Sequence, residues 1–135
     1  MSPNLSYLLT NNLAQVRGIS QVVAVSADGL LLAWTDGLNR EAAERIAAVA
    51  AGMSSLLNGA ARDLGAGPVE GNITHLAEGF LILRAVSNGA SLLALAARGA
   101  DIACVTLEVA RFAEEVAHHL TPAFAGSLAA AGPSR

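Results

Sequence analysis

A run of small, uncharged residues, 47–61, occupies the middle of the longest predicted helix. A helix on a protein surface normally has one apolar stripe and one charged face, and this run offers water no charged face. We therefore expect the helix to be covered on two sides. A membrane span is disfavoured, because Ser54, Ser55 and Asn58 dilute the run below the roughly 20 strongly apolar residues that a bilayer requires.

Two stripes at helical spacing support this expectation. The first stripe would seat the helix on a core, and its members recur three and four positions apart: Ala43, Ile46, Ala47, Ala50, Met53, Leu57 and Leu64. The second stripe lies on another face, where small side chains would let a second backbone approach closely; it consists of Ala48, Gly52, Ser55 and Gly59. The second stripe predicts an interface with a partner helix. A central helix in a compact monomer is the alternative.

Composition excludes several classes of function. A net charge of -3 and an aromatic content of 4% disfavour a nucleic-acid surface, which needs basic patches and stacking platforms. Every basic residue is arginine, so the chain lacks the lysine of a phosphate-binding loop and of Schiff-base chemistry. We expect no cofactor and no nucleic-acid partner.

The single cysteine and the start of the chain bear on location. Cys104 cannot form an internal disulfide, and its neighbours Ala103 and Val105 predict a buried position. Residues 1–4 lack the basic region and apolar run of a signal peptide, and no segment reads as a stop-transfer sequence. We predict a soluble, cytoplasmic protein that does not insert into membranes.

The remaining segments predict an α+β fold. Leucines on one face indicate a first helix over residues 4–16, followed by strands at 21–26 and 30–35 around the turn at Asp28 and Gly29. The long helix covers 39–64. Three strands follow, at 69–76, 80–86 and 91–97, and a final helix begins after Asp101 and ends before Pro122. We predict one domain over 1–124 and a flexible tail over 125–135.

The third predicted strand differs from its neighbours. Glu70, Asn72 and Thr74 alternate with less polar residues, and Pro68 stands at the start of the strand. Polar alternation with a proline is typical of an edge strand, whereas the continuously apolar run 91–97 is typical of a central one. The third strand is thus predicted to lie at an edge of the sheet.

Few residues suggest catalysis. His118 and His119 are adjacent, so on a helix they point about 100° apart and do not bind one metal from the same face. His75 stands alone in the polar strand, and no serine lies in a G-x-S-x-G elbow. We predict no catalytic site and no metal site.

Trp34 ends the second strand, where it would either pack within the protein or anchor a partner.

In this order of elements the chain resembles the roadblock/LC7 proteins, and in particular the short stand-alone actinobacterial members encoded in the gene clusters called conservons. The resemblance covers almost the whole chain. Its motifs are the opening residues 8–13 with Val16, Gly18 and Ile19, the hairpin 24–32, the small-residue segments 52–56 and 59–62, and the C-terminal segments 105–110 and 120–122.

The resemblance implies a profilin-like fold, in which a five-stranded antiparallel sheet has the long helix on one face and the terminal helices on the other. It also implies dimers in which the long helices align and the polar edge strands join into one continuous sheet. The expected dimer interface combines the two features identified above: Ala48, Gly52, Ser55, Gly59, Glu70, Asn72 and Thr74.

The resemblance further implies a protein without catalytic residues that binds a Ras-like small GTPase as a homodimeric regulator or scaffold. Conservon relatives also point to a sensor histidine kinase and other conservon products as partners. An arginine supplied to the GTPase would come from Arg45 or Arg62.

A small-ligand sensor of similar shape is the alternative, and it requires a pocket with polar anchors. An enzyme is a third, weaker reading, which a pocket lined by His75 and a carboxylate would revive.

Overall fold

The computed structural model describes residues 5–119, without the side chains of Asn88, His118 and His119. The predicted tail, 125–135, and the predicted end of the domain lie outside this part. The elements follow the predicted order: α1 Leu5–Asn11, η1 Leu13–Gln15, β1 Ile19–Val25, β2 Leu31–Trp34, α2 Arg40–Leu64, β3 Gly71–Leu76, β4 Gly79–Ala85, η2 Ser87–Gly89, β5 Ser91–Ala97 and α3 Ile102–His119.

The five strands form one antiparallel sheet in the order β2-β1-β5-β4-β3. The apolar strand β5 is therefore central and the polar strand β3 is an edge strand, as the sequence predicts. In the tight β1–β2 turn, Gly29 has φ 91, a conformation that favours glycine. The order of the strands leaves β2 and β3 as the two edges.

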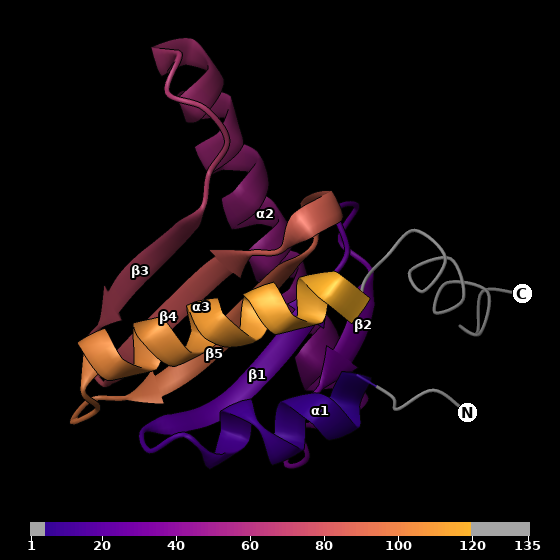
Figure 1. Ribbon diagram of the computed structural model, residues 1–135, viewed down its shortest axis with the longest axis vertical. Helices are drawn as coiled ribbons and strands as arrows, with labels where there is room; N and C mark the ends of the chain where they lie inside the picture. The colour runs from indigo at the N-terminus through magenta and orange to yellow at the C-terminus, as the bar shows by residue number, and fades with distance from the viewer. Residues whose placement is uncertain (1–4, 120–135) are drawn as a thin grey trace, which may run out of the picture.

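The helices cover both faces of the sheet. In Figure 1, α1 and α3 lie in front of the sheet and α2 lies behind it. The front core contains residues of α1, η1, α3 and the sheet, among them Leu9, Leu13, Val22, Ile82, Leu92, Val105, Val109 and Phe112. The core behind the sheet is smaller: Val23, Val25, Ala47, Ala50, Leu83 and Leu93, with Ile46, Met53 and Leu57 packed against them. This arrangement confirms the predicted fold class.

The long helix has the ends that its sequence indicates. The Asn39 side chain accepts a hydrogen bond from the backbone N–H of Ala42 at 2.8 Å and so caps the first turn. At the other end Gly65 adopts a left-handed conformation with φ 63. The last turns of α2 project beyond the sheet (Figure 1). Leu64 is 78% exposed there, so its predicted place in the core stripe is wrong.

Two other predictions need correction. The first helix does not continue over 4–16; it ends at Asn11, and η1 follows, so that Leu13 turns into the core. The predicted burial of Cys104 is also wrong, since that residue is exposed on the first turn of α3. Its backbone N–H donates to the side chain of Asp101 at 3.1 Å, so Asp101 caps the helix that the sequence predicts to begin after it.

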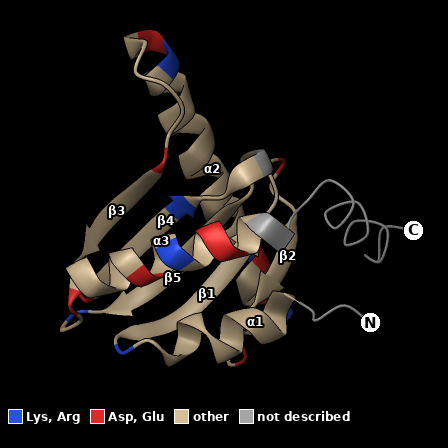
Figure 2. Cartoon of the chain, viewed as in Figure 1, with Lys and Arg blue, Asp and Glu red and all other residues tan. Residues whose placement is uncertain are grey.

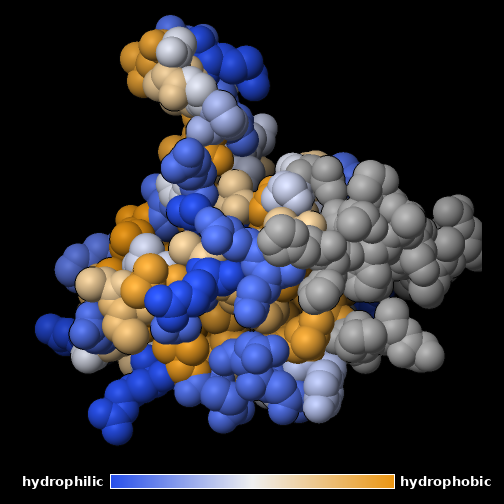
Figure 3. Space-filling model, in the orientation of Figure 1, coloured by the Kyte–Doolittle hydropathy of each residue, from blue (hydrophilic) through white to orange (hydrophobic). Residues whose placement is uncertain are grey.

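The surface is unevenly charged. In Figure 2 the middle of α2 carries neither colour of charge, whereas its projecting end carries both. Figure 3 shows apolar and hydrophilic residues side by side on this projecting end. Within residues 5–119, no helix combines the length and the hydropathy that a membrane crossing would need.

Candidate functional site

The two edges of the sheet differ in how their backbone groups are satisfied. At β2, the backbone N–H of Trp34 donates to the Ser6 hydroxyl at 3.2 Å, and that of Asp36 donates to the Thr10 hydroxyl at 3.3 Å. Both hydroxyls belong to α1, which therefore covers the C-terminal end of this edge, at Trp34 and just beyond the strand at Asp36. At β3, the ladder to β4 uses one side of the strand. An uncovered edge strand presents N–H and C=O groups that another strand can pair with.

The side chains of β3 divide between the two faces of the sheet. Asn72 and Thr74 are partly buried and lie opposite Leu83 and Leu81 on the α2 side. The Thr74 hydroxyl donates to the Asn72 side-chain oxygen at 2.7 Å. Ile73, on the α3 side, is 49% exposed. The strand therefore exposes an apolar side chain on the α3 side of the sheet.

The remaining β3 residues flank this edge. Glu70 directly precedes the strand and is exposed. The ring of His75 lies 4.7 Å from that of Phe80, between centroids, so this histidine packs on its neighbour in β4. It lies apart from the hollow of about 700 Å³ beside β3, whose polar side chains come from Glu70, Asn72, Arg84 and Thr106. Among the residues described, no group of histidine, cysteine and carboxylate side chains could hold a metal ion.

The small-residue stripe of α2 is open. Ala48, Gly52 and Ser55 are exposed and Gly59 is partly exposed, whereas Ala43, Ala47 and Ala50 are buried against the sheet. A Cβ atom added at Gly52 would meet nothing within 4 Å, and one at Gly59 would meet only the Arg62 side chain. Nothing within the described chain therefore requires glycine at these two positions.

Two bulky apolar residues beside this stripe were missed by the sequence analysis. Val49 is 49% exposed and Leu56 is 79% exposed, within a helix whose core stripe faces the other way. The spacing did indicate this exposure. Each residue lies one position after a member of the small stripe, and neither belongs to the core stripe or to the small stripe. The open face of α2 is thus apolar as well as small.

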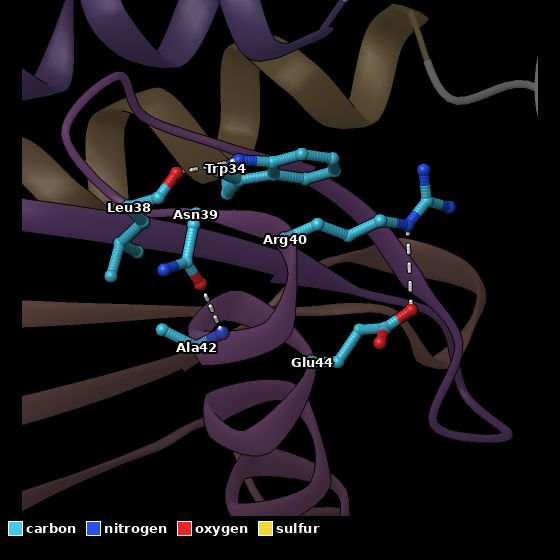
Figure 4. Close-up of polar contacts among 6 residues, drawn as sticks. All are labelled: Trp34, Leu38, Asn39, Arg40, Ala42 and Glu44. Carbon is cyan, nitrogen blue, oxygen red and sulfur yellow. Dashed lines mark hydrogen bonds and ion pairs between the residues drawn. The ribbon is translucent and has the colours of Figure 1, made fainter.

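Trp34 is partly buried at the start of α2 (Figure 4). Its indole N–H donates to the backbone oxygen of Leu38 at 3.1 Å. The guanidinium carbon of Arg40 lies 5.6 Å from the ring centroid, and this arginine forms an ion pair with Glu44 at 3.4 Å. The ring and its N–H are therefore engaged within the chain.

Arg45 and Arg62 are both exposed on α2. They point about 100° apart around the helix, at 3.6 residues per turn. Neither belongs to the ion pairs found in the described chain, which join Arg40 to Glu44 and Arg111 to Glu108. The structure thus does not bring Arg45, Arg62 and Trp34 into one site.

Comparisons with known proteins match this architecture. The family model of the Roadblock/LC7 domain matches residues 5–96. A Roadblock/LC7 domain structure from Streptomyces avermitilis is 29% identical, with a TM-score of 0.80, and the match covers 87% of this chain and 98% of that one. None of the curated proteins matches.

More distant structures share the fold alone. Myxococcus xanthus MglB is 17% identical with a TM-score of 0.72, over 82% of this chain and 87% of that one. The gliding protein MglB from Thermus thermophilus is 16% identical with a TM-score of 0.74, over 84% of this chain and 86% of that one. Because the family model spans more than half of the sequence, this chain belongs to the Roadblock/LC7 domain family.

Proposed function

We propose that this protein is a homodimeric, non-enzymatic regulator or scaffold that binds a Ras-like small GTPase in a bacterial signalling complex. The observation that carries the proposal is the pair of uncovered surfaces on one side of the molecule. One is the β3 edge, and the other is the uncharged outer face of α2. Both are suited to association with protein rather than to chemistry.

In the proposed dimer a two-fold axis passes beside β3. Two β3 strands related by this axis run antiparallel and extend the sheet, which also makes the two α2 helices antiparallel. The interface includes backbone groups of β3 and the residues predicted from sequence: Ala48, Gly52, Ser55, Gly59, Glu70, Asn72 and Thr74. The covered β2 edge supports this choice, because it leaves β3 as the edge that accepts another strand.

The GTPase is the less direct half of the proposal. Membership of the Roadblock/LC7 family supports a protein partner, and the absence of a metal-ligand cluster within residues 5–119 is compatible with a regulator. Arg45, Arg62 and the edge of Trp34 are the side chains proposed for contact with this partner. A sensor histidine kinase and other conservon products are further proposed partners, in an assembly that is cytoplasmic and reaches the membrane through them.

The experiment has two stages. Sedimentation of the purified protein measures its mass, and we expect a dimer that Gly52→Leu splits, because a bulky residue there obstructs the approach of a second helix. The matched variant Gly99→Leu adds the same side chain at a loop position with open space and should keep the dimer.

The second stage measures binding to the Ras-like GTPase encoded nearest the gene, loaded with GDP or with a non-hydrolysable GTP analogue, and the hydrolysis rate with and without this protein. Binding that depends on the nucleotide supports a regulator, and equal binding supports a scaffold. Absence of binding to a folded GTPase contradicts the proposal. It would favour the small-ligand sensor, for which the hollow beside β3 offers Glu70 and Arg84 as polar anchors.

A further inference from the structure

Arg45 and Asp63 occupy the same angular position on α2. They are 18 residues apart in the sequence, which is five turns at 3.6 residues per turn and about 27 Å along the axis. Both residues are exposed. Neither takes part in the ion pairs found within residues 5–119. One face of the helix therefore carries a positive charge near one end and a negative charge near the other.

Between these charges, bulky apolar residues alternate with glycines on the same face. Val49 and Leu56 project into solvent, and Gly52 and Gly59 have open space where a side chain would stand. The angular positions of these four residues fall within about 80° of one another, at 100° per residue. The face thus carries two apolar projections and two gaps.

This face points toward the side of the molecule where β3 lies. Ala51, on the other flank of α2, lies against the β1–β2 turn, 3.3 Å from where a Cβ of Gly29 would stand. The β1–β2 turn belongs to the β2 end of the sheet. The opposite flank, with Val49 and Leu56, therefore faces the β3 end, where the sheet is open to another strand.

Three pairs of residues on this face share one midpoint along the helix axis, at the level of residue 54. The pairs are Arg45 and Asp63, Val49 and Gly59, and Gly52 and Leu56. Consider two identical helices that pack antiparallel about a two-fold axis at a given level of the helix. A residue above that level in one helix then comes opposite the residue that lies equally far below it in the partner helix. An axis at position 54 therefore opposes a positive to a negative charge and a bulky side chain to a glycine.

We propose that the partner of this face is a second copy of the chain, packed antiparallel with the two-fold axis at position 54. Arg45 then pairs with Asp63 of the partner subunit, and the symmetry repeats this ion pair at the other end. Leu56 fills the gap at Gly52 of the partner subunit, and Val49 that at the partner's Gly59. This inference rests on the proposed homodimer and adds its register, with the ion pair as the element that selects an identical partner.

Charge reversal tests the register. We expect Arg45→Asp and Asp63→Arg each to raise the dimer dissociation constant about tenfold or more, since each places like charges together at both ends of the helix pair. The double variant Arg45→Asp/Asp63→Arg restores opposite charges and should return the constant to within about threefold of the unmodified protein. Sedimentation equilibrium at low and high salt measures these constants, and high salt should reduce the effect of each single reversal.

Arg17→Asp is the matched control, because it makes the same charge change at an exposed arginine between η1 and β1, away from α2 and β3. It should leave the dissociation constant unchanged. A monomeric unmodified protein would refute the homodimer itself. A dimer whose constant ignores the single reversals, or is not restored by the double variant, would keep the homodimer and overturn this register. Circular dichroism verifies that each exposed variant remains folded.

Discussion

The side-chain oxygen of Asn58 accepts a hydrogen bond from the backbone N–H of Val69 at 3.1 Å. This contact joins the projecting part of α2 to the segment that returns to the sheet and leads into β3. Val69 is partly buried, so its N–H has limited access to water. The bond therefore fixes the path by which the chain enters the open edge strand.

Replacement of Asn58 by alanine should loosen this segment. The N–H of Val69 loses its acceptor, and we expect unfolding free energy to fall by about 1 kcal/mol. Hydrogen exchange at the Val69 amide measures the change locally and should speed up. Asn58→Asp, which keeps an acceptor oxygen, is the control and should retain most of the protection. Equal exchange rates in Asn58→Ala and the unmodified protein would contradict this role.

Gly79, the first residue of β4, should not tolerate a side chain. A Cβ there would stand 2.5 Å from the backbone oxygen of Ala96, in a hydrogen-bonded ladder that has little room to shift. We expect Gly79→Ala to lower the unfolding free energy by about 2 kcal/mol or more. Gly99→Ala adds the same methyl group in open space and should change stability by less than about 0.5 kcal/mol. Urea unfolding at one protein concentration compares the two.

The hydroxyls of α1 should stabilise the β2 edge. In Ser6→Ala/Thr10→Val the N–H groups of Trp34 and Asp36 lose their acceptors. We expect a loss of about 1–2 kcal/mol in unfolding free energy, and faster hydrogen exchange at these two amides. Thr10→Ser retains the hydroxyl and should behave like the unmodified protein. Unchanged exchange at both amides in the double variant would show that α1 does not hold this edge.

Trp34 is the only tryptophan in the chain, so its fluorescence reports on the start of α2. Arg40→Ala removes the guanidinium beside the ring and exposes the indole to more water. We expect a red shift of the emission and a loss of about 0.5–1 kcal/mol in unfolding free energy. Glu44→Gln keeps Arg40 but removes its ion pair; because both side chains of that pair are more than half exposed, it should cost less. An unshifted emission in Arg40→Ala would show that the guanidinium does not shield the indole from water.

Local chemistry made much of this fold predictable. The Asp28-Gly29 turn, the Asn39 and Asp101 caps and the glycine at 65 fix element boundaries through contacts between near neighbours in the sequence. The edge position of β3 also followed from its polar pattern. These signals operate within a few residues, and sequence reasoning can therefore find them.

Other features depend on where elements end relative to one another. Leu64 has the spacing of a core residue, but α2 is longer than the width of sheet beneath it. Cys104 has apolar neighbours, but the turn of α3 that carries it faces solvent. No pattern in a single helix specifies these relations, because each depends on the position of another element.

The hydroxyl contacts at β2 have a consequence for the assembly of many copies. A sheet with two open edges can add chains at both ends without limit, which is the route to fibres. When Ser6 and Thr10 occupy the end of the β2 edge, the β3 edge is the growth point of each chain, and in the proposed homodimer the meeting of two such edges ends the reaction. Two side chains on a short helix would thus turn an otherwise open-ended polymerisation into a closed pair.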